Sequence, residues 1–153
     1  MTEAIDRVAA WAAVLRVHAA LLPKLERAVT RAGLPLTWYD VLLVLNAAPD
    51  RRLTMSELGA QAVVSRERVS RVVQELERAG LVDRSPNPDD KRSSYAQISR
   101  EGRHRLAAVA PVYLAGIEEH FTGHLSDREI VAVTKALGKV LAAEDSRRTP
   151  TAG

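Results

Sequence analysis

The sequence contains no cysteine and very few aromatic residues. Without cysteine the chain cannot form a disulfide, hold a metal through thiolates or sense oxidants through a thiol. Aromatic residues make up only 4% of the 153 residues, so leucine, valine and alanine must supply most of the core. A core of this composition favours packed α-helices, and a chain of this length corresponds to about one domain.

Long apolar runs are also absent. No stretch approaches the roughly 18 uninterrupted apolar residues that a membrane span requires. The N-terminal segment, MTEAIDRVAA, lacks the basic region and apolar core of a secretory signal. We therefore expect a cytoplasmic protein with no membrane partner.

Motifs of the common enzyme classes are missing as well. The sequence contains no Walker phosphate loop, no G-x-G-x-x-G and no H-E-x-x-H. It also shows no Ser, His and acid arrangement beyond what chance supplies. We therefore expect a binding protein that is not an enzyme and needs no cofactor.

The segment from 54 to 99 carries the clearest pattern. Between 66 and 79, apolar residues at helical spacing would line one face and charged side chains the other. Ser65 is the expected N-cap of this helix, and Gly80 follows its last turn, where a left-handed residue is usual. The apolar stripe comprises Val69, Val72, Val73 and Leu76, and the opposite face holds Glu67, Arg71, Gln74 and Arg78, flanked by Arg68 and Ser70.

A short helix and a hairpin flank this helix. Thr54 and Glu57 stand in the T-x-x-E relation of a capping box, so a short helix should begin there. Downstream, 81–85 and 93–98 flank the tip at 86–90, whose prolines and aspartates are typical of a hairpin turn. The order of elements is therefore helix, turn, helix and wing.

The wing region resembles the multiple-antibiotic-resistance regulator (MarR) family. The similarity rests on SELGAQAVVS, on RVSRVVQELERAGLVDR and on NPDDKRSSYAQIS followed by REG. Its most specific part is the Asp90-x-Arg92 pair, which a strand and a Ser-x-x-Gly helix start follow. The resemblance implies a mainly α fold with a small β wing, in which N- and C-terminal dimerisation helices flank a winged helix-turn-helix DNA-binding lobe. It also implies a homodimeric transcriptional regulator that binds double-stranded DNA.

Val63 departs from the family pattern. Many relatives carry glycine in the turn of the motif, whereas this chain has a β-branched residue there. Because β-branched residues resist positive φ, we expect a turn of another type.

Two further elements should complete the lobe. Thr37 and Asp40 suggest an N-cap for an apolar helix over 38–47. Residues 51–53 can add a third strand beside the wing.

Helical periodicity outside the lobe predicts the domain organisation. Apolar residues recur at helical spacing in the N-terminal segment and after the wing, and Ser126 and Glu129 form an S-x-x-E box that starts a last helix. These helices carry more apolar surface than one small domain needs. We predict one MarR-type domain over 1–145, with the DNA-binding lobe at about 36–99, dimerisation helices at about 4–32 and 100–145, and a disordered tail at 146–153.

Basic residues concentrate on the winged segment. Residues 51–105 contain 12 Lys and Arg against 8 Asp and Glu, whereas the rest of the chain contains 10 against 11. A phosphate-binding surface needs such an excess, because counterion release supplies much of the affinity for DNA. Arginine and glutamine read bases in the major groove, and a wing arginine suits a narrow minor groove. We expect Asp90 to orient Arg92 through an ion pair. The predicted DNA-binding residues are Ser65, Arg66, Arg68, Ser70, Arg71, Gln74, Asp90, Lys91 and Arg92.

A dimer of this kind predicts its operator and a regulatory site. Two motifs would enter successive major grooves about 34 Å apart, so the operator should be an imperfect palindrome. We also expect a small aromatic or phenolic effector between the dimerisation helices and the lobe, whose binding weakens DNA binding. Polar-tipped aromatic side chains suit such a ring, although core filling is the competing interpretation for each. The candidates are Trp11, His18, Trp38, Tyr39 and Tyr113.

Two alternative functions remain open. His120 and His124 stand at i, i+4, which can place two imidazoles on one helical face, as a zinc-type metal-sensing regulator of the same fold would need. Gly123 and the cap at Ser126 argue against it, because they indicate that the helix has ended. The other alternative is a non-sensing architectural DNA-binding module, which needs no ligand cavity.

Overall fold

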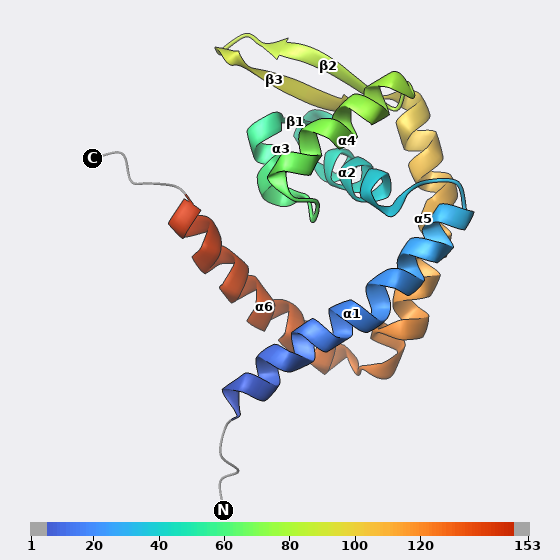
Figure 1. The fold of residues 1–153 in the computed structure, drawn as a ribbon, viewed down its shortest axis with the longest axis vertical. Helices are drawn as coiled ribbons and strands as arrows, with labels where there is room; N and C mark the ends of the chain where they lie inside the picture. The colour runs from blue at the N-terminus through green and yellow to red at the C-terminus, as the bar shows by residue number, and fades with distance from the viewer. Residues whose placement is uncertain (1–5, 149–153) are drawn as a thin grey trace, which may run out of the picture.

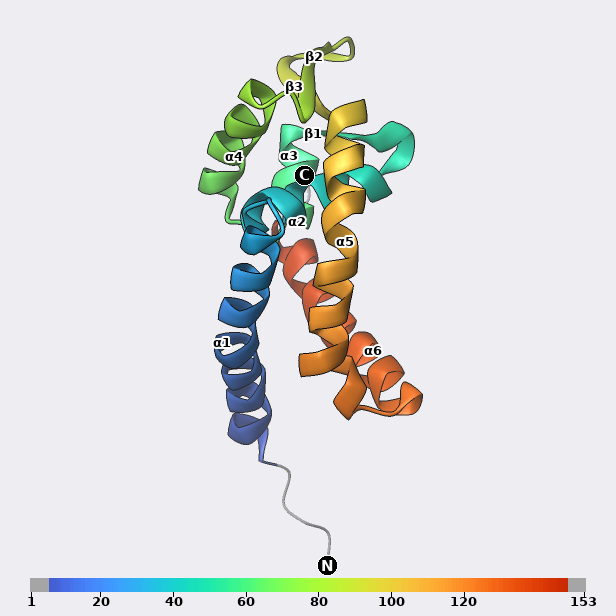
Figure 2. The same ribbon diagram turned by 90° about the vertical axis from the view of Figure 1, so that its right-hand side faces the viewer.

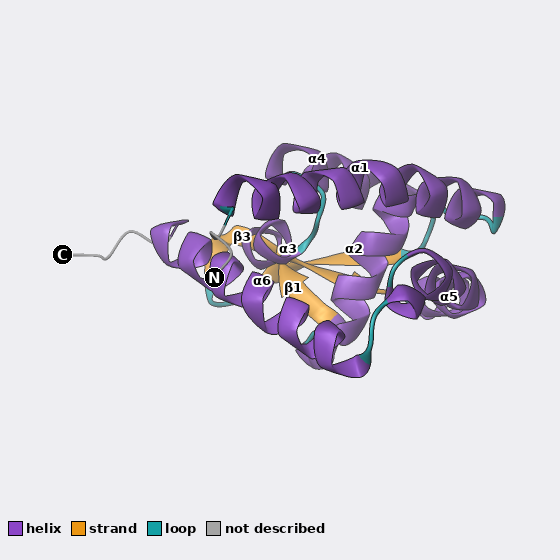
Figure 3. Cartoon of the chain, turned by 90° about the horizontal axis from the view of Figure 1, so that it is seen from below, coloured by secondary structure: helices purple, strands orange, loops and turns teal. Residues whose placement is uncertain are grey.

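The computed structural model describes residues 6–148 and is built mainly of helices, with strands in one small sheet (Figures 1 and 3). This is the mainly α fold with a β wing that the sequence predicts. The elements in chain order are α1 (Arg7–Arg31), α2 (Leu36–Ala47), the 3-10 turn η1 (Pro49–Arg51), β1 (Arg52–Thr54), α3 (Met55–Gln61), α4 (Arg66–Arg78), β2 (Val82–Asn87), β3 (Asp90–Ile98), α5 (Arg100–His120), the 3-10 turn η2 (Thr122–His124) and α6 (Asp127–Arg148).

The start of α2 differs from the prediction. The helix begins at Leu36 and its N-cap is Pro35, not Thr37. The N–H of Tyr39 donates to the carbonyl of Pro35 at 3.0 Å, which draws Thr37 into the first turn. Proline has no N–H to leave unsatisfied at this position. Asp40 is therefore not needed to start α2, and its carboxylate accepts a hydrogen bond from the N–H of Val63 instead.

The helix-turn-helix forms as its local signals predict. The hydroxyl of Thr54 accepts from the N–H of Glu57 at 3.2 Å, and the carboxylate of Glu57 accepts from the N–H of Thr54 at 2.8 Å, completing the capping box of α3. Ser65 is the N-cap residue of α4, although its hydroxyl makes no capping hydrogen bond. Gly80 closes α4 with φ of 73°. The predicted stripe of Val69, Val72, Val73 and Leu76 is buried.

The sheet joins the wing to the lobe. Its strand order is β1-β3-β2, with antiparallel pairing throughout, and Leu53 of β1 lies opposite Ala96 of β3. The third strand predicted beside the wing is therefore present as β1. The two hairpin strands run further toward the tip than predicted, with an irregularity between Pro86 and Asn87. The hairpin projects beyond α4 at one end of the molecule (Figure 1).

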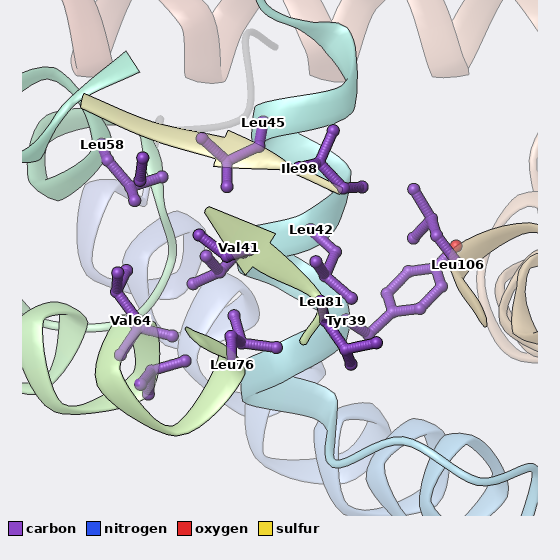
Figure 4. Close-up of a cluster of buried hydrophobic side chains, with 14 of the residues drawn as sticks. Tyr39, Val41, Leu42, Leu45, Leu58, Val64, Leu76, Leu81, Ile98 and Leu106 are labelled. Atoms are coloured by element: carbon purple, nitrogen blue, oxygen red, sulfur yellow. The ribbon is translucent and has the colours of Figure 1, made fainter. Parts of the chain in front are cut away.

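One aliphatic core holds the lobe together (Figure 4). It joins α2, α3, α4, the sheet and the first half of α5, so both helices of the motif rest on the same apolar cluster. Tyr39 is the only aromatic side chain among the fully buried residues of the described chain. The labelled members in Figure 4 are Tyr39, Val41, Leu42, Leu45, Leu58, Val64, Leu76, Leu81, Ile98 and Leu106.

Away from the lobe, α1 and α5 run side by side as an arm, and α6 runs back from its far end (Figure 2). No residue of α6, all of which the structure describes, is buried. The arm and α6 therefore leave much apolar surface uncovered. The large exposed apolar side chains on α1, α5 and α6 are Val8, Trp11, Val14, Leu15, Val17, Leu114, Val131, Leu137, Val140 and Leu141.

By length and composition alone, α1 is apolar enough to cross a membrane. Eighteen of its residues reach a mean hydropathy of 1.4, and none of that window is buried. The apolar run is interrupted by Arg16 and His18, and the end of α1 packs on α5 near Gly116. We interpret its exposed apolar face as a protein contact.

The ends of the predicted dimerisation helices also need adjustment. Asp6 caps α1, accepting from the N–H of Ala9 at 2.9 Å, and residues 4 and 5 of the predicted range lie outside the described residues. At the other end, α6 continues to Arg148, so residues 146–148 of the expected disordered tail are helical. Residues 149–153 lie outside the described part of the chain.

Candidate nucleic-acid interface and adjoining cavity

The basic face of α4 is exposed because its opposite face is buried in the lobe, where α4 packs on α2 and α3. Every residue predicted for DNA contact on this helix is accessible to solvent. Because the helix is amphipathic, burial of its apolar stripe leaves its arginines facing solvent. The exposed set is Ser65, Arg66, Arg68, Ser70, Arg71 and Gln74.

Arg71 is held by a neighbouring carboxylate. Its Nε donates to Oε1 of Glu75 at 3.3 Å, and 82% of its side chain remains exposed. The other carboxylate oxygen, Oε2, accepts from Nε1 of Trp38 on α2 at 3.0 Å. These contacts, with Trp38 first and Arg71 second, hold the pKa of Glu75 below its usual value. Trp38 therefore joins α2 to α4, and it is not among the residues that line the cavity described below.

The wing tip does not contain the expected ion pair. Oδ1 of Asp90 accepts instead from the backbone N–H of Arg92 at 3.0 Å. An aspartate two residues before an N–H can close a local turn in this way, which satisfies the carboxylate without a guanidinium. Asn87 repeats the arrangement, because its Oδ1 accepts from the N–H of Asp89 at 3.0 Å. Within residues 6–148 the guanidinium of Arg92 has no bonded partner.

Arg84 is a further exposed arginine of the wing, and the sequence prediction omitted it. The residue is exposed on β2, and its Nη2 donates to Oγ of Ser94 on β3 at 2.8 Å. Its basic charge, two residues before the predicted hairpin tip, could have identified it as a candidate for DNA contact. The wing therefore carries basic side chains along its length as well as at its tip.

The turn between α3 and α4 needs no glycine. Among the described residues the only positive φ values outside glycine belong to Asp50 and Arg51, so Val63 adopts an ordinary negative φ. Oδ2 of Asp40 accepts from the N–H of Val63 at 2.9 Å. The prediction of a different turn type is confirmed, and a carboxylate from α2 stabilises it.

A cavity of about 390 Å³ lies beside this turn, between the arm and the lobe. His18 and Tyr113, two of the predicted ligand-binding residues, line it. Tyr39 is buried behind Tyr113, with ring centroids 4.6 Å apart. Trp11 is 62% exposed on the free half of α1 and does not line the cavity. The remaining lining residues are Leu22, Leu25, Glu26, Leu36, Thr37, Asp40, Val63, Val64, Ser65 and Arg68.

Helical spacing could have identified part of this lining. Leu22, Leu25 and Glu26 follow His18 at intervals of four, seven and eight, which places all four on one face of α1. No local pattern marks the contributions of Asp40 and Arg68, since these depend on how α2 and α4 pack. Ser65 is the N-cap of α4 and Arg68 lies in its first turn, so the cavity reaches the helix that carries the basic face.

Burial changes the acidity of the cavity groups. It raises the pKa of Asp40, although backbone hydrogen bonds from Val63 and Val64 act in the opposite direction. Burial also raises the pKa of Tyr113, and the carboxylate of Asp40 raises it further. The phenol of Tyr113 therefore stays protonated at neutral pH and can donate a hydrogen bond.

The two histidines of the metal-sensing alternative do not share a helix. His120 is the last residue of α5, and His124 lies in η2. Nε2 of His124 lies 3.0 Å from the carbonyl oxygen of Glu119, which occupies that ring nitrogen. Residues 6–148 contain no group of three His, Cys, Asp or Glu side chains that could hold a metal ion.

Comparison with known proteins identifies the family. The sequence profile of the MarR family matches residues 32–93, from the residue after α1 into β3 of the wing. The transcriptional regulator HosA of Escherichia coli O111:H- is 30% identical over 108 residues, which cover 71% of this chain and 69% of HosA. The chain belongs to the MarR family. Its relatives are transcriptional regulators, so the expectation of a non-enzyme is confirmed.

Solved MarR structures share the fold over almost the whole chain. AbsC of Streptomyces coelicolor has a TM-score of 0.79 and 28% identity, covering 97% of this chain and all of AbsC (100%). Sco3205 of the same organism, solved in complex with DNA, has a TM-score of 0.77 and 28% identity, covering 99% of this chain and 94% of Sco3205. The MarR fold therefore includes the arm and α6 as well as the lobe.

Asp40 generates a prediction about stability and pH. Asp40→Ala should lower the free energy of unfolding by about 1 kcal/mol, because the N–H of Val63 loses its acceptor. Asp40→Asn keeps an acceptor oxygen and should lose less. Denaturant unfolding of the three proteins, followed by circular dichroism, measures both effects.

The sign of the pH effect follows from burial. Because the folded pKa of Asp40 lies above its usual 3.8, the folded state holds this proton more tightly than the unfolded chain. The contribution of Asp40 to stability is then largest below pH 3.8 and declines as the pH rises through the folded pKa. Asp40→Asn should lack this decline, and an identical pH dependence in wild type and Asp40→Asn would contradict the assignment.

Proposed function

We propose that this MarR-family protein is a sequence-specific, ligand-responsive repressor that binds a palindromic operator as a homodimer in the cytoplasm. The observation that carries the proposal is the juxtaposition of two exposed basic elements, α4 and the wing, on one lobe. We treat 1–145 as a single domain whose lobe spans about 36–99. Sco3205, a relative with the same fold, has been solved with DNA, which supports this reading.

In this proposal α4 reads bases in the major groove. Arginine pairs bidentately with guanine and glutamine with adenine, so Arg66, Arg68, Arg71 and Gln74 are the base-reading candidates, with Ser70 beside them. Ser65 and the amides at the start of α4 suit a phosphate, because its hydroxyl makes no capping bond. The exposed basic face of α4 supports this assignment.

The wing would enter the adjacent minor groove through Arg92, with Lys91 near the phosphates. A narrow A·T-rich groove concentrates negative potential, and a guanidinium is well suited to it. The two side-chain-closed turns at Asn87 and Asp90 restrict the tip, so less entropy is lost when Arg92 docks. Asp90 would then act on the backbone of Arg92 and not on its guanidinium.

Arg71 provides the first test of base reading. Arg71→Ala should relax the preference at one base pair of each half-site by about 1–3 kcal/mol. Arg78→Ala, at the far end of α4, should weaken binding to all duplexes alike and lower the salt dependence by about one phosphate. Both are measured by fluorescence anisotropy on a duplex selected from a random library and on its single-base variants.

Two outcomes would contradict this assignment. Equal weakening of every duplex by Arg71→Ala would move Arg71 to the phosphate contacts. Equal wild-type affinity for selected and shuffled duplexes would favour the architectural alternative.

Asp90 is tested by a matched pair of substitutions. Asp90→Ala removes both the charge and the acceptor of the wing turn, whereas Asp90→Asn removes only the charge. We expect Asp90→Ala to weaken operator binding and Asp90→Asn to preserve or tighten it, since the turn bond survives. If both variants tighten binding equally, only the net charge of the wing matters.

A second copy of this chain is the proposed cover for the exposed apolar side chains of α1, α5 and α6. Monomeric proteins rarely leave so large an apolar surface in water. Two lobes joined through these helices could reach successive major grooves, which would make the operator palindromic.

The dimer can be tested by sedimentation. The wild-type protein should sediment as a dimer at micromolar concentration, and Leu141→Glu on α6 should shift it toward monomer, because a charge replaces a 66% exposed leucine at the interface. Lys135→Glu on the same helix is the control, since its position already tolerates a hydrated charge. A monomeric wild type would contradict the proposal.

The cavity is the proposed effector site. Its volume of about 390 Å³ falls within the range of small-ligand pockets, about 300–1,000 Å³. An aromatic ring would lie against its leucines and Tyr113, and a phenolic hydroxyl could donate to Asp40. Because Asp40 holds the turn before α4, such a ligand would compete with the N–H of Val63 and shift the recognition helix.

The effector proposal predicts a selective loss of response. A panel of phenols and phenolic acids should include a compound that weakens binding to the selected duplex. His18→Ala and Tyr113→Phe should reduce that response, while Trp11→Phe, which alters an aromatic residue outside the cavity, should not. Operator affinity that stays unchanged across the panel would remove the support for a sensor role.

A further inference from the structure

Two hydrogen bonds link the core of the lobe to an arginine on the basic face of α4. Trp38 is half-buried and packs against the core cluster from α2. Its indole N–H reaches Oε2 of Glu75 at 3.0 Å, and Oε1 of Glu75 accepts from Nε of Arg71 at 3.3 Å. One carboxylate therefore bridges a core-anchored ring and a largely exposed guanidinium.

The choice of partner shows that this is not an ordinary surface ion pair. Arg71 has glutamates four residues away on both sides, Glu67 and Glu75. In an isolated helix the order acid then base is the more favourable i, i+4 arrangement, which favours Glu67. Within the described residues, however, Arg71 pairs with Glu75 alone. Glu75 differs from Glu67 in accepting a hydrogen bond from the indole of Trp38.

Trp38 lowers the entropic cost of forming the ion pair between Arg71 and Glu75. An exposed ion pair normally contributes little, because two long side chains must both be ordered. Glu75 is already ordered by the indole of another helix, so only Arg71 loses freedom when the pair forms. The lowered pKa of Glu75 keeps the carboxylate ionised at neutral pH.

The pair also decides which edge of the guanidinium remains available. Arginine presents five N–H donors in one plane, and Glu75 occupies the Nε donor. The two Nη groups are left for a bidentate contact with guanine. At the same time the carboxylate partly neutralises Arg71, which weakens its attraction to the phosphates that every DNA sequence offers.

We propose that Glu75, fixed by Trp38, is a positioning residue that makes Arg71 selective for base edges over phosphates. The inference rests on the proposed function, since it assumes that α4 reads DNA. It adds that sequence selectivity depends on a residue of α2 that need not touch DNA.

The test compares Glu75→Gln with Glu67→Gln, which makes the same chemical change on the other side of Arg71. Trp38→Phe is the third variant, because it keeps the charge of Glu75 and an aromatic ring at position 38 but removes the indole donor. The measured quantity is the ratio of affinities for the selected duplex and for a shuffled duplex of the same composition. Circular dichroism melting and sedimentation of each variant check that fold and assembly are retained.

We expect Glu75→Gln to lower this affinity ratio about tenfold, mainly by tightening binding to the shuffled duplex. Trp38→Phe should lower the ratio to a similar extent without a comparable rise in affinity for the shuffled duplex. Glu67→Gln should tighten binding to both duplexes equally and leave the ratio unchanged.

Equal effects of Glu75→Gln and Glu67→Gln on both duplexes would overturn the inference, and so would an unchanged ratio in Trp38→Phe. A different result would contradict the proposed function itself, namely a wild-type protein that shows no preference for the selected duplex. If wild type is selective and Arg71→Ala lowers the affinity ratio while Glu75→Gln does not, only the positioning role of Glu75 is wrong.

Discussion

The burial of the apolar stripe of α4 in the core, against α2 and α3, is the contact on which the rest of the lobe depends. Val73 and Leu76 are completely buried there, and the burial of side chains of this size stabilises the fold by about 1.5–3 kcal/mol each. Because a helix has two faces, the same contact turns its arginines outward. The wing follows, since β2 begins directly after α4 and the sheet packs on the same core.

The first turns of α2 connect the parts of the molecule. Three consecutive residues, Trp38, Tyr39 and Asp40, project about 100° apart and reach different neighbours. Trp38 donates a hydrogen bond to Glu75 of α4, Tyr39 packs in a tilted arrangement on Tyr113 of α5, and Asp40 accepts from the N–H of Val63. Movement of α2 relative to the arm would therefore act on both ends of α4. This gives a physical route from the cavity to the proposed DNA-binding face of α4.

The lobe and the arm differ in how much of their apolar surface is buried within one chain. The lobe closes its core within one chain, whereas α6 buries no residue and the free half of α1 exposes Val8 and Trp11. Solved members of the family share the fold over almost the whole chain, so the arm and α6 are part of that fold. In the proposed dimer, the apolar composition of α1 serves contact between protein chains, although composition alone would also suit a membrane.

The sequence by itself determined the features whose signals are local. The capping boxes at Thr54 and Ser126, the stripe of α4 and the hairpin follow from neighbours a few residues apart, and all are present. The tertiary structure decided the partners of Trp38 and Asp40, which lie 37 and 23 residues away along the chain. It also decided the role of Asp90, because spacing alone allows both a guanidinium and a backbone N–H as its partner. Local hydrogen bonds and periodicity can be read from sequence, whereas these contacts exist only after the helices have packed.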